Sequence, residues 1–400
     1  MDMTTTHAPI YLDYAASTPL SADVADAMYR AMTDPMMNGN PSSNTHEYGS
    51  RAQEAVLHAR QQVAGLIGAS WREIVFTSGA TESNNIILQG VVKHFKDNNP
   101  AHTPCHLITS AIEHKAVLSV MQSLAEQDDV FLTVLTPDEN GLITADAVED
   151  AMTPNTVLVS IMHVNNEVGN INPVMEIGKL CEKRNVLFHV DASQSVGKLP
   201  VDVEQMGANF VSFSAHKMYG PRGAGALYFN LANRRDFSPL MQGGDQERTI
   251  RPGTLATHQI IGFGKAADIA SRQLSAHLEY AQNIKAVFLD TLRKHNVEIE
   301  LNSNLGCSSP FILNLRFLGV ESDTLMMACA DKVAFSTGSA CNSANKTDSY
   351  VLHALYPDRQ NTGSDARFSF SHLSTIDDVR QAAEYLAEKI ALIISINMCE

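Results

Sequence analysis

An aspartate and a lysine each follow a predicted strand, and the two could act together on one bound molecule. Asp191 comes directly after the apolar run 187–190, and Lys217 follows the run 210–214 by three residues. Ligands of parallel sheets bind at the carboxyl ends of strands, so both residues are expected at such a binding edge. The pair could be a plain ion pair. It could also hold an organic cofactor, with the lysine bound to it covalently and the carboxylate against its ring.

Pyridoxal phosphate requires the second arrangement. A lysine forms its Schiff base, and a carboxylate keeps the pyridine nitrogen protonated so that the ring is an electron sink. The segment 77–82 offers the phosphate site that this cofactor also needs, because Ala80 and Thr81 lie at a strand-to-helix junction with small residues and free backbone N–H groups. An ordinary helix N-cap at Thr81 is the alternative. The segment lacks the Gly-x-Gly-x-x-Gly pattern and the P-loop lysine, which disfavours dinucleotide and nucleoside triphosphate sites.

Further polar residues lie near predicted strand ends. Ser214 and His216, beside Lys217, could also reach a phosphate group. His114 follows another predicted strand and could stack on a cofactor ring, although an ordinary histidine is the alternative. Arg367 lies within a strand-like run, so its charge needs a partner, which could be a substrate carboxylate or a structural one.

One of the six cysteines lies in an unusual place. Cys341 belongs to the small, polar stretch 336–343, which has no apolar periodicity and predicts a mobile loop, whereas free cysteines are mostly buried. The others fit structural or incidental positions, with Cys307 as the one rival in a predicted loop: Cys105, Cys181, Cys307, Cys329 and Cys399. Six cysteines without a Cys-x-x-Cys pair are too few for a disulfide framework, which predicts a reducing cytoplasm.

The elements that must position these residues alternate along the chain. Strand-like runs and helical patterns follow one another between about residues 73 and 214, which predicts a parallel sheet with helices on both faces. Beyond about residue 262 a long helix and shorter strands predict a second, smaller α+β domain. We therefore expect an α/β protein with a large domain over 15–261 and a small domain over 1–14 and 262–400, which carries the cysteine loop at about 336–348.

Charge and hydropathy exclude several classes of protein. The net charge is −15, from 29 Lys plus Arg and 44 Asp plus Glu, and it repels a polyanion, so we expect no direct nucleic-acid binding. No apolar run approaches the length of a membrane helix, and the first residues lack the pattern of a secretory signal. We expect no membrane association and no metal site.

The chain resembles cysteine desulfurases of the NifS/IscS type, in the class V aminotransferase group of fold-type I pyridoxal-phosphate enzymes. The resemblance extends from residue 11 to the last predicted helix, and its motifs are the segments 11–16, 73–83, 113–117, 160–167, 189–197, 214–217 and 339–341. It implies a large domain with a mainly parallel seven-stranded sheet sandwiched by helices, plus a small α+β domain.

The resemblance also implies a role for individual residues. Lys217 resembles the Schiff-base lysine, Cys341 the nucleophile and His114 the residue stacked on the cofactor ring. Residues that match binders of pyridoxal phosphate are Lys217, Asp191, Gln194, His114, Ala80, Thr81, Ser214, His216 and Thr254. Thr254 matches a ligand supplied by the other subunit, which implies a homodimer with shared active sites. Asn165 and Arg367 match binders of the substrate carboxylate.

The implied activity converts L-cysteine to L-alanine, with the sulfur carried as a persulfide on Cys341 and passed to an acceptor protein. The alternatives are a selenocysteine lyase or other β-eliminating lyase, and a non-catalytic scaffold. The short loop motif at Cys341 favours desulfuration. The intact set of Lys217, Asp191, His114 and Cys341 argues against a scaffold. The acceptor stays open between iron–sulfur cluster assembly, tRNA thiolation and DNA phosphorothioation, because the segment after Arg367 looks shorter than in long bacterial members.

Overall fold

The computed structural model describes residues 8–337, 349–359 and 364–397, so Cys341 and most of its predicted loop lie outside the described residues. The chain divides into two compact units. The larger comprises residues 18–165 and 172–274, and the smaller comprises 1–17, 166–171 and 275–400. This division falls inside the long helix α7 (Thr257–Lys294), after residue 274, whereas our prediction placed the domain boundary between residues 261 and 262, near the start of the same helix. The predicted domain bounds stay a proposal.

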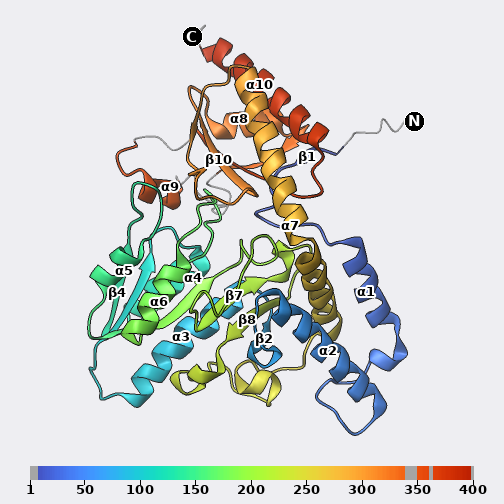
Figure 1. Ribbon diagram of the computed structural model, residues 1–400, viewed down its shortest axis with the longest axis vertical. Coiled ribbons are helices and arrows are strands. Elements are labelled where there is room, and N and C mark those ends of the chain that lie inside the picture. The colour runs from blue at the N-terminus through green and yellow to red at the C-terminus, as the bar shows by residue number, and fades with distance from the viewer. Residues whose placement is uncertain (1–7, 338–348, 360–363, 398–400) are drawn as a thin grey trace. The chain divides into compact units, whose positions relative to one another are not determined.

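A seven-stranded sheet forms the centre of the larger unit, as predicted (Figure 1). Its strands, in spatial order, are β2 (Ile74–Thr77), β8 (Gly225–Phe229), β7 (Phe210–Ser214), β6 (Leu187–Asp191), β5 (Thr156–Ser160), β3 (Cys105–Ser110) and β4 (Val130–Leu135). Only β8 runs antiparallel to its neighbours β2 and β7, while the links from β7 to β4 are all parallel. The sheet is therefore mainly parallel, and its sequence pattern of apolar runs follows from burial on both faces.

A hydrophobic core lies on each face of this sheet. Leu158 and Val159 are neighbours in β5 but belong to different clusters of buried apolar residues, because successive strand residues point to opposite faces. The helices of this unit are α1 (Ala22–Thr33), α2 (Glu47–Leu66), α3 (Ala80–Asn98), α4 (Lys115–Ala125), α5 (Ala145–Ala151), α6 (Val174–Arg184) and the first part of α7. Short 3₁₀ helices are η1 (Pro35–Met37), η2 (Trp71–Glu73), η3 (Ala215–Lys217), η4 (Leu231–Asp236) and η5 (Gln246–Thr249).

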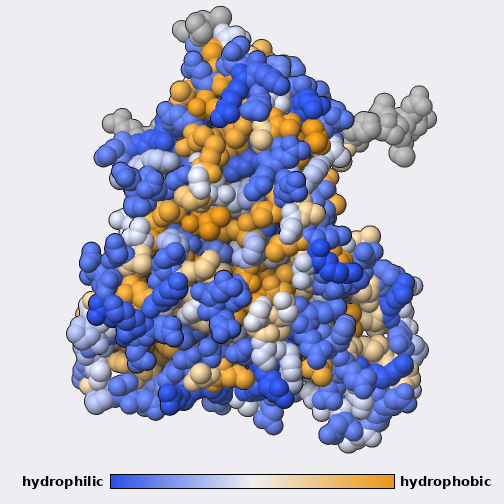
Figure 2. All heavy atoms as spheres, viewed as in Figure 1, coloured by the Kyte–Doolittle hydropathy of each residue, from blue (hydrophilic) through white to orange (hydrophobic). Residues whose placement is uncertain are grey.

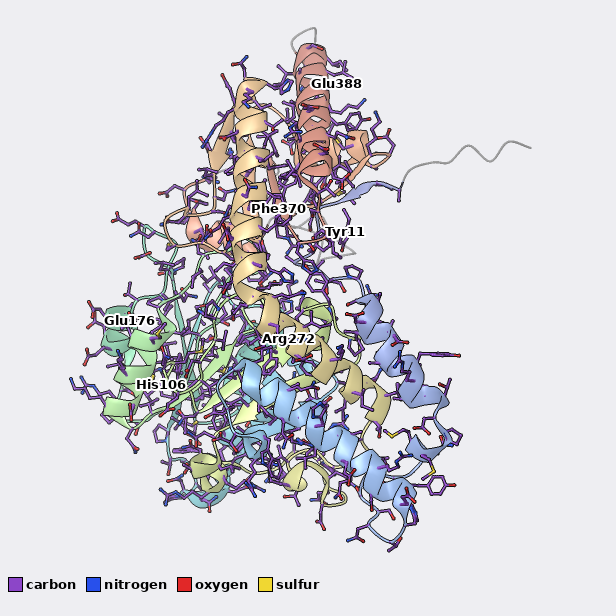
Figure 3. The ribbon with its side chains drawn as sticks, turned by 45° about the vertical axis from the view of Figure 1, so that its right-hand side comes forward. Tyr11, His106, Glu176, Arg272, Phe370 and Glu388 are labelled. Atoms are coloured by element: carbon purple, nitrogen blue, oxygen red, sulfur yellow. The ribbon has the colours of Figure 1, made fainter. Side chains whose placement is uncertain are left out.

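The smaller unit has an α+β fold, as predicted. Its antiparallel sheet has the order β12 (Ser336–Thr337), β13 (Asp365–Ser369), β10 (Ile312–Phe317) and β9 (Ile299–Leu301), and β1 (Ile10–Tyr11) pairs in parallel with β11 (Val333–Ala334). The helices are the end of α7, α8 (Ser322–Cys329), α9 (Tyr350–Leu355) and α10 (Ile376–Asn397). Phe370, labelled in Figure 3, packs its ring 5.5 Å from that of Phe288 on α7. The strand predicted near 334–336 is two short strands in different sheets.

The surface shown in Figure 2 is covered mostly by hydrophilic residues, with apolar residues interspersed. Among the described helices, none is both long enough and apolar enough to cross a membrane.

Candidate active site

The strand order brings most predicted site residues to one edge of the larger unit's sheet. Strands β2, β7, β6, β5 and β3 all run in the same direction, so their carboxyl ends lie at the same edge. The segments that follow these ends are 78–81, 215–217, 192–194, 161–165 and 111–114. This edge is where ligands of parallel sheets bind.

Asp191 is the last residue of β6 and is only 5% exposed. Its Oδ1 accepts a hydrogen bond from Ser193 N at 2.9 Å, and its Oδ2 accepts one from Asn84 Nδ2 at 2.9 Å. A carboxylate has about four acceptor positions. The two bonds therefore orient the Asp191 carboxylate and leave acceptor capacity for a further donor.

Asn84 is a residue that our sequence analysis missed. It lies on α3 with no exposed surface, four residues after Ala80, so the two residues share one face of the helix. A polar residue within the apolar stripe of a predicted helix is the signal that could have revealed it, because buried polar groups need hydrogen-bond partners.

The predicted phosphate junction forms between β2 and α3. Ala80 N donates a hydrogen bond to Ser214 Oγ at 2.7 Å, so the structure brings these two predicted ligands together. Glycines make this approach possible, because a Cβ on Gly225 would lie 2.4 Å from Gly79 Cα. Gly79 is the N-cap of α3, so the alternative in which Thr81 caps the helix is wrong. Thr81 is exposed in the first turn.

Lys217 ends η3, directly after β7, and is half-buried. The hydroxyl of Thr18 donates to His216 O at 2.9 Å and accepts from Tyr219 N at 2.7 Å. Tyr219 has a left-handed backbone with φ of 62°. Thr18 thus closes the turn that carries Lys217, and sequence reasoning missed it because the chain separates Thr18 from this turn by almost 200 residues.

His216 lies between Ser214 and Lys217 at this edge. Burial, together with the positive charges of Lys217 and Arg222, lowers the pKa of His216 to about 4. The imidazole is therefore neutral at pH 7 and offers both a donor and an acceptor nitrogen.

His114 is the N-cap of α4. Its Nδ1 accepts a hydrogen bond from Ala116 N at 3.1 Å, which fixes the ring against the helix. The preceding Glu113 is fully buried, and its Oε1 accepts bonds of 2.8 Å from Ser110 Oγ and Met162 N. Burial raises the pKa of Glu113 to about 8.

A family model with the description "Aminotransferase class-V" matches residues 10–382 of the chain. The chain belongs to this family. Cysteine desulfurase IscS of Shewanella denitrificans is 45% identical to it over 382 residues, which cover 96% of this chain and 93% of that protein. A solved NifS-like protein has a TM-score of 0.87 at 31% identity and covers 96% of this chain and 100% of its own. The solved structure of SspA in complex with cysteine has a TM-score of 0.78 at 34% identity, over 92% of this chain and 100% of its own.

Class V aminotransferases depend on pyridoxal phosphate, and the residues at the sheet edge of this family member fit that cofactor. Among the described residues, Asn84 Oδ1 and Ser193 Oγ are buried atoms without a hydrogen-bond partner, and both side chains adjoin the Asp191 carboxylate. A carboxylate, a lysine and a helix N-terminus with Ser214 beside it are the donor and acceptor types that the ring, the aldehyde and the phosphate require.

The other predicted ligands of the cofactor and the substrate differ in burial and in hydrogen bonding. Gln194 is buried, and its Oε1 accepts a hydrogen bond from Lys198 Nζ at 3.0 Å. Asn165 is buried in the larger unit, where its Nδ2 donates to Ile112 O at 2.9 Å. Thr254 is exposed between η5 and α7.

Arg367 lies on β13 in the smaller unit and is 8% exposed. Its Nη2 donates to Asp13 Oδ1 at 2.7 Å, and its Nη1 donates to Asn166 O at 2.8 Å. The structural carboxylate that the sequence left open as an alternative partner is therefore present. Arg367 Nε is buried and has no hydrogen-bond partner within the described part of the chain.

Three of the cysteines are buried, and burial disfavours their thiolate form. Cys105, Cys181 and Cys329 are buried, and burial raises their pKa to about 11, about 12 and about 12, respectively. A thiol is nucleophilic as a thiolate, so burial disfavours a part for these three in sulfur chemistry at neutral pH. Cys307 is half-buried, and Cys341 and Cys399 lie outside the described residues.

Proposed function

We propose that this class V enzyme is a cysteine desulfurase, which converts L-cysteine to L-alanine and places the sulfur on Cys341. The observation that carries the proposal is the grouping of Asp191, Ser214 and Lys217 at the ends of adjacent strands, in a chain that is 45% identical to a cysteine desulfurase. A second solved relative, SspA, was captured with cysteine.

Pyridoxal phosphate, when bound, supplies an electron sink for the bonds at the substrate Cα. Lys217 would hold the cofactor in the resting enzyme, and its Nζ would then take and return the Cα proton. The Asp191 carboxylate, which Asn84 orients, would accept a hydrogen bond from the ring nitrogen. His114 is the residue proposed to cover one face of the ring, and Gln194 to bind its phenolic oxygen.

The phosphate group would be held by short polar residues and by backbone N–H groups at the positive end of α3. The proposed ligands are Ala80, Thr81, Ser214, His216 and, from the second subunit of a homodimer, Thr254. The neutral His216 ring can donate to a phosphate oxygen without adding charge. Asn165 and Arg367 are proposed to bind the substrate carboxylate, with Asp13 holding the guanidinium in place.

The sulfur step needs a thiolate, and Cys341 is the proposed nucleophile. Its Sγ forms an S–S bond with the substrate sulfur while the substrate C–S bond breaks. The electron pair of that bond stays with the carbon fragment, which takes up a proton and leaves as L-alanine. The balance is one L-cysteine and one Cys341 thiol converted to one L-alanine and one Cys341 persulfide.

The persulfide is then passed to an acceptor protein. Iron–sulfur cluster assembly, tRNA thiolation and DNA phosphorothioation each supply such an acceptor. The net charge of −15 disfavours direct contact with tRNA or DNA, so an intermediary protein is the expected partner. We place the enzyme in a reducing compartment, the cytoplasm, because oxidation would trap the Cys341 thiolate as a disulfide.

The test uses the purified holoenzyme and L-cysteine. The wild-type protein is expected to be yellow, to release L-alanine and to carry a persulfide on Cys341, detected by alkylation and peptide mass spectrometry. Cys341→Ser keeps the colour but forms neither product, and Lys217→Ala loses the colour. Cys307→Ser and Lys179→Ala are the matched controls, since Lys179 is exposed on α6. A colourless wild-type protein, or wild-type alanine release by Cys341→Ser, would disprove the proposal.

A further inference from the structure

A buried ion pair lies along the outer edge of the seven-stranded sheet. Among the described strands, β2 is terminal in the sheet and pairs only with β8, so its other edge would leave backbone groups of Ile74 and Phe76 unpaired. Arg60 Nη1 instead donates to Ile74 O at 2.6 Å, and Phe76 N donates to Glu247 Oε2 at 2.8 Å. The side chains of Arg60 and Glu247 thus take the place of a neighbouring strand.

The two side chains bind each other in a bidentate pair. Arg60 Nη1 lies 2.7 Å from Glu247 Oε2, and Arg60 Nη2 lies 2.5 Å from Oε1. The side chains are 8% and 1% exposed, and the guanidinium carbon lies 4.6 Å from the centroid of the Phe76 ring. A buried ion pair offsets its desolvation only when its geometry is good and its other hydrogen bonds are made. This pair meets both conditions and so holds the edge of β2 in one position.

Glu247 reaches this position on a left-handed turn. The residues Glu247, Arg248 and Thr249 have φ angles of 46°, 55° and 66°, which residues other than glycine rarely adopt. Arg248 Nη2 also donates to Ile74 O, at 3.0 Å, so two arginines bind the same carbonyl. Such a backbone persists only where surrounding contacts enforce it, and the contacts at β2 do so here.

The same segment contacts the β2–α3 junction four residues later. Arg251 Nε donates to Glu82 Oε1 at 2.7 Å, and Glu82 Oε2 accepts a bond from Ser78 N at 2.6 Å. Gly253 N donates to Gln246 Oε1 at 3.1 Å and so joins the two ends of the segment 246–253. The segment is therefore bound to β2 through Glu247, and Glu82 links its Arg251 to Ser78, the first residue after β2.

We infer that Arg60 and Glu247 are positioning residues for the phosphate site, although neither touches the phosphate. They fix β2, and through Arg251 they set the direction of the backbone N–H groups at 78–81. Thr254 follows Arg251 by three residues, so the same pair also holds the segment that would offer Thr254 to a second subunit. The inference rests on the proposed function, which makes the 78–81 junction the binding site of a phosphate ester.

The test compares pyridoxal phosphate with pyridoxal, which lacks the phosphate, on the cofactor-free full chain. Arg60→Lys keeps the charge but loses the bidentate pair, and Arg251→Lys breaks the link to Glu82. We expect each variant to bind pyridoxal phosphate about tenfold more weakly and pyridoxal with unchanged affinity. The control is Arg184→Lys, which alters an exposed ion pair with Glu149 in the same unit.

The outcomes separate a positioning role from a general loss of stability. Equal weakening for both ligands, or unchanged affinity for pyridoxal phosphate, would overturn the inference. Should Arg60→Lys not fold, Arg251→Lys decides the question, because its side chain is 27% exposed. A wild-type protein that binds neither ligand overturns the proposed function and the inference together, whereas a failure seen only in the variants overturns the inference alone.

Discussion

The side-chain amide of Asn84 donates a 2.9 Å hydrogen bond to the Asp191 carboxylate, and the two residues come from different elements, α3 and β6. Asn84 is fully buried, so water does not replace the bond when it is lost. The carboxylate proposed to face the cofactor ring is thus held by a residue from the helix that begins at the phosphate junction.

Asn84→Ala is expected to weaken binding of pyridoxal phosphate about tenfold, because Asp191 loses one of its two orienting donors. Asn84→Asp is expected to weaken it further, since a second carboxylate beside Asp191 favours protonation of the pair. Titration of the cofactor-free protein with pyridoxal phosphate measures both effects. Asn98→Ala, at the far end of the same helix, is the control. If Asn84→Asp bound pyridoxal phosphate with wild-type affinity, Asn84 would not be the residue that prepares the Asp191 carboxylate for the cofactor.

Thr18→Val removes the hydroxyl between His216 and Tyr219 while keeping the side-chain shape. The turn that carries Lys217 then loses two hydrogen bonds, so we expect kcat with L-cysteine to fall about tenfold with little change in KM. Thr18→Ser keeps the hydroxyl and is expected to restore the rate. Alanine release at several L-cysteine concentrations separates the two constants. If Thr18→Val released alanine at the wild-type rate, the hydroxyl would have no positioning role.

Glu113 makes folding stability depend on pH. Its pKa of about 8 in the folded chain lies above the ordinary value, so the protonated form favours folding. This contribution is full below about pH 4 and is lost as the pH rises through about 8, at about 1.4 kcal/mol of unfolding free energy per pH unit between them. In Glu113→Gln the loss is absent, so the variant is expected to gain stability relative to wild type as the pH rises.

Urea unfolding of both proteins at about pH 5 and about pH 8 measures this difference. Comparing the two proteins removes the contributions of His163 and His189, because burial lowers the pKa of each to about 4 and neither residue is changed. The exposed Glu126→Gln serves as the control. A constant difference between wild type and Glu113→Gln would mean that Glu113 is ionised in the folded protein throughout this range.

Much of the larger unit could be predicted from the sequence, because its signals are local. A buried parallel strand is a short apolar run, and the residue that follows it lies at the carboxyl edge wherever the strand falls in the sheet. This reasoning placed Asp191 and Lys217 at that edge, and in the structure Asp191 is the last residue of β6 while Lys217 follows β7 by three residues. It did not reveal the antiparallel β8, because direction and order in a sheet depend on pairing between distant segments.

The amino-acid sequence by itself determined the class of the fold, the strand-end positions of the acid and the lysine, and the resemblance that the family match confirmed. Only the tertiary structure decided which groups hold those residues. Thr18 meets His216 across 198 residues of chain, and Arg367 meets Asp13 across 354. Such contacts have no local pattern, because they form when folding brings remote polar groups into a buried place where each must find a hydrogen-bond partner.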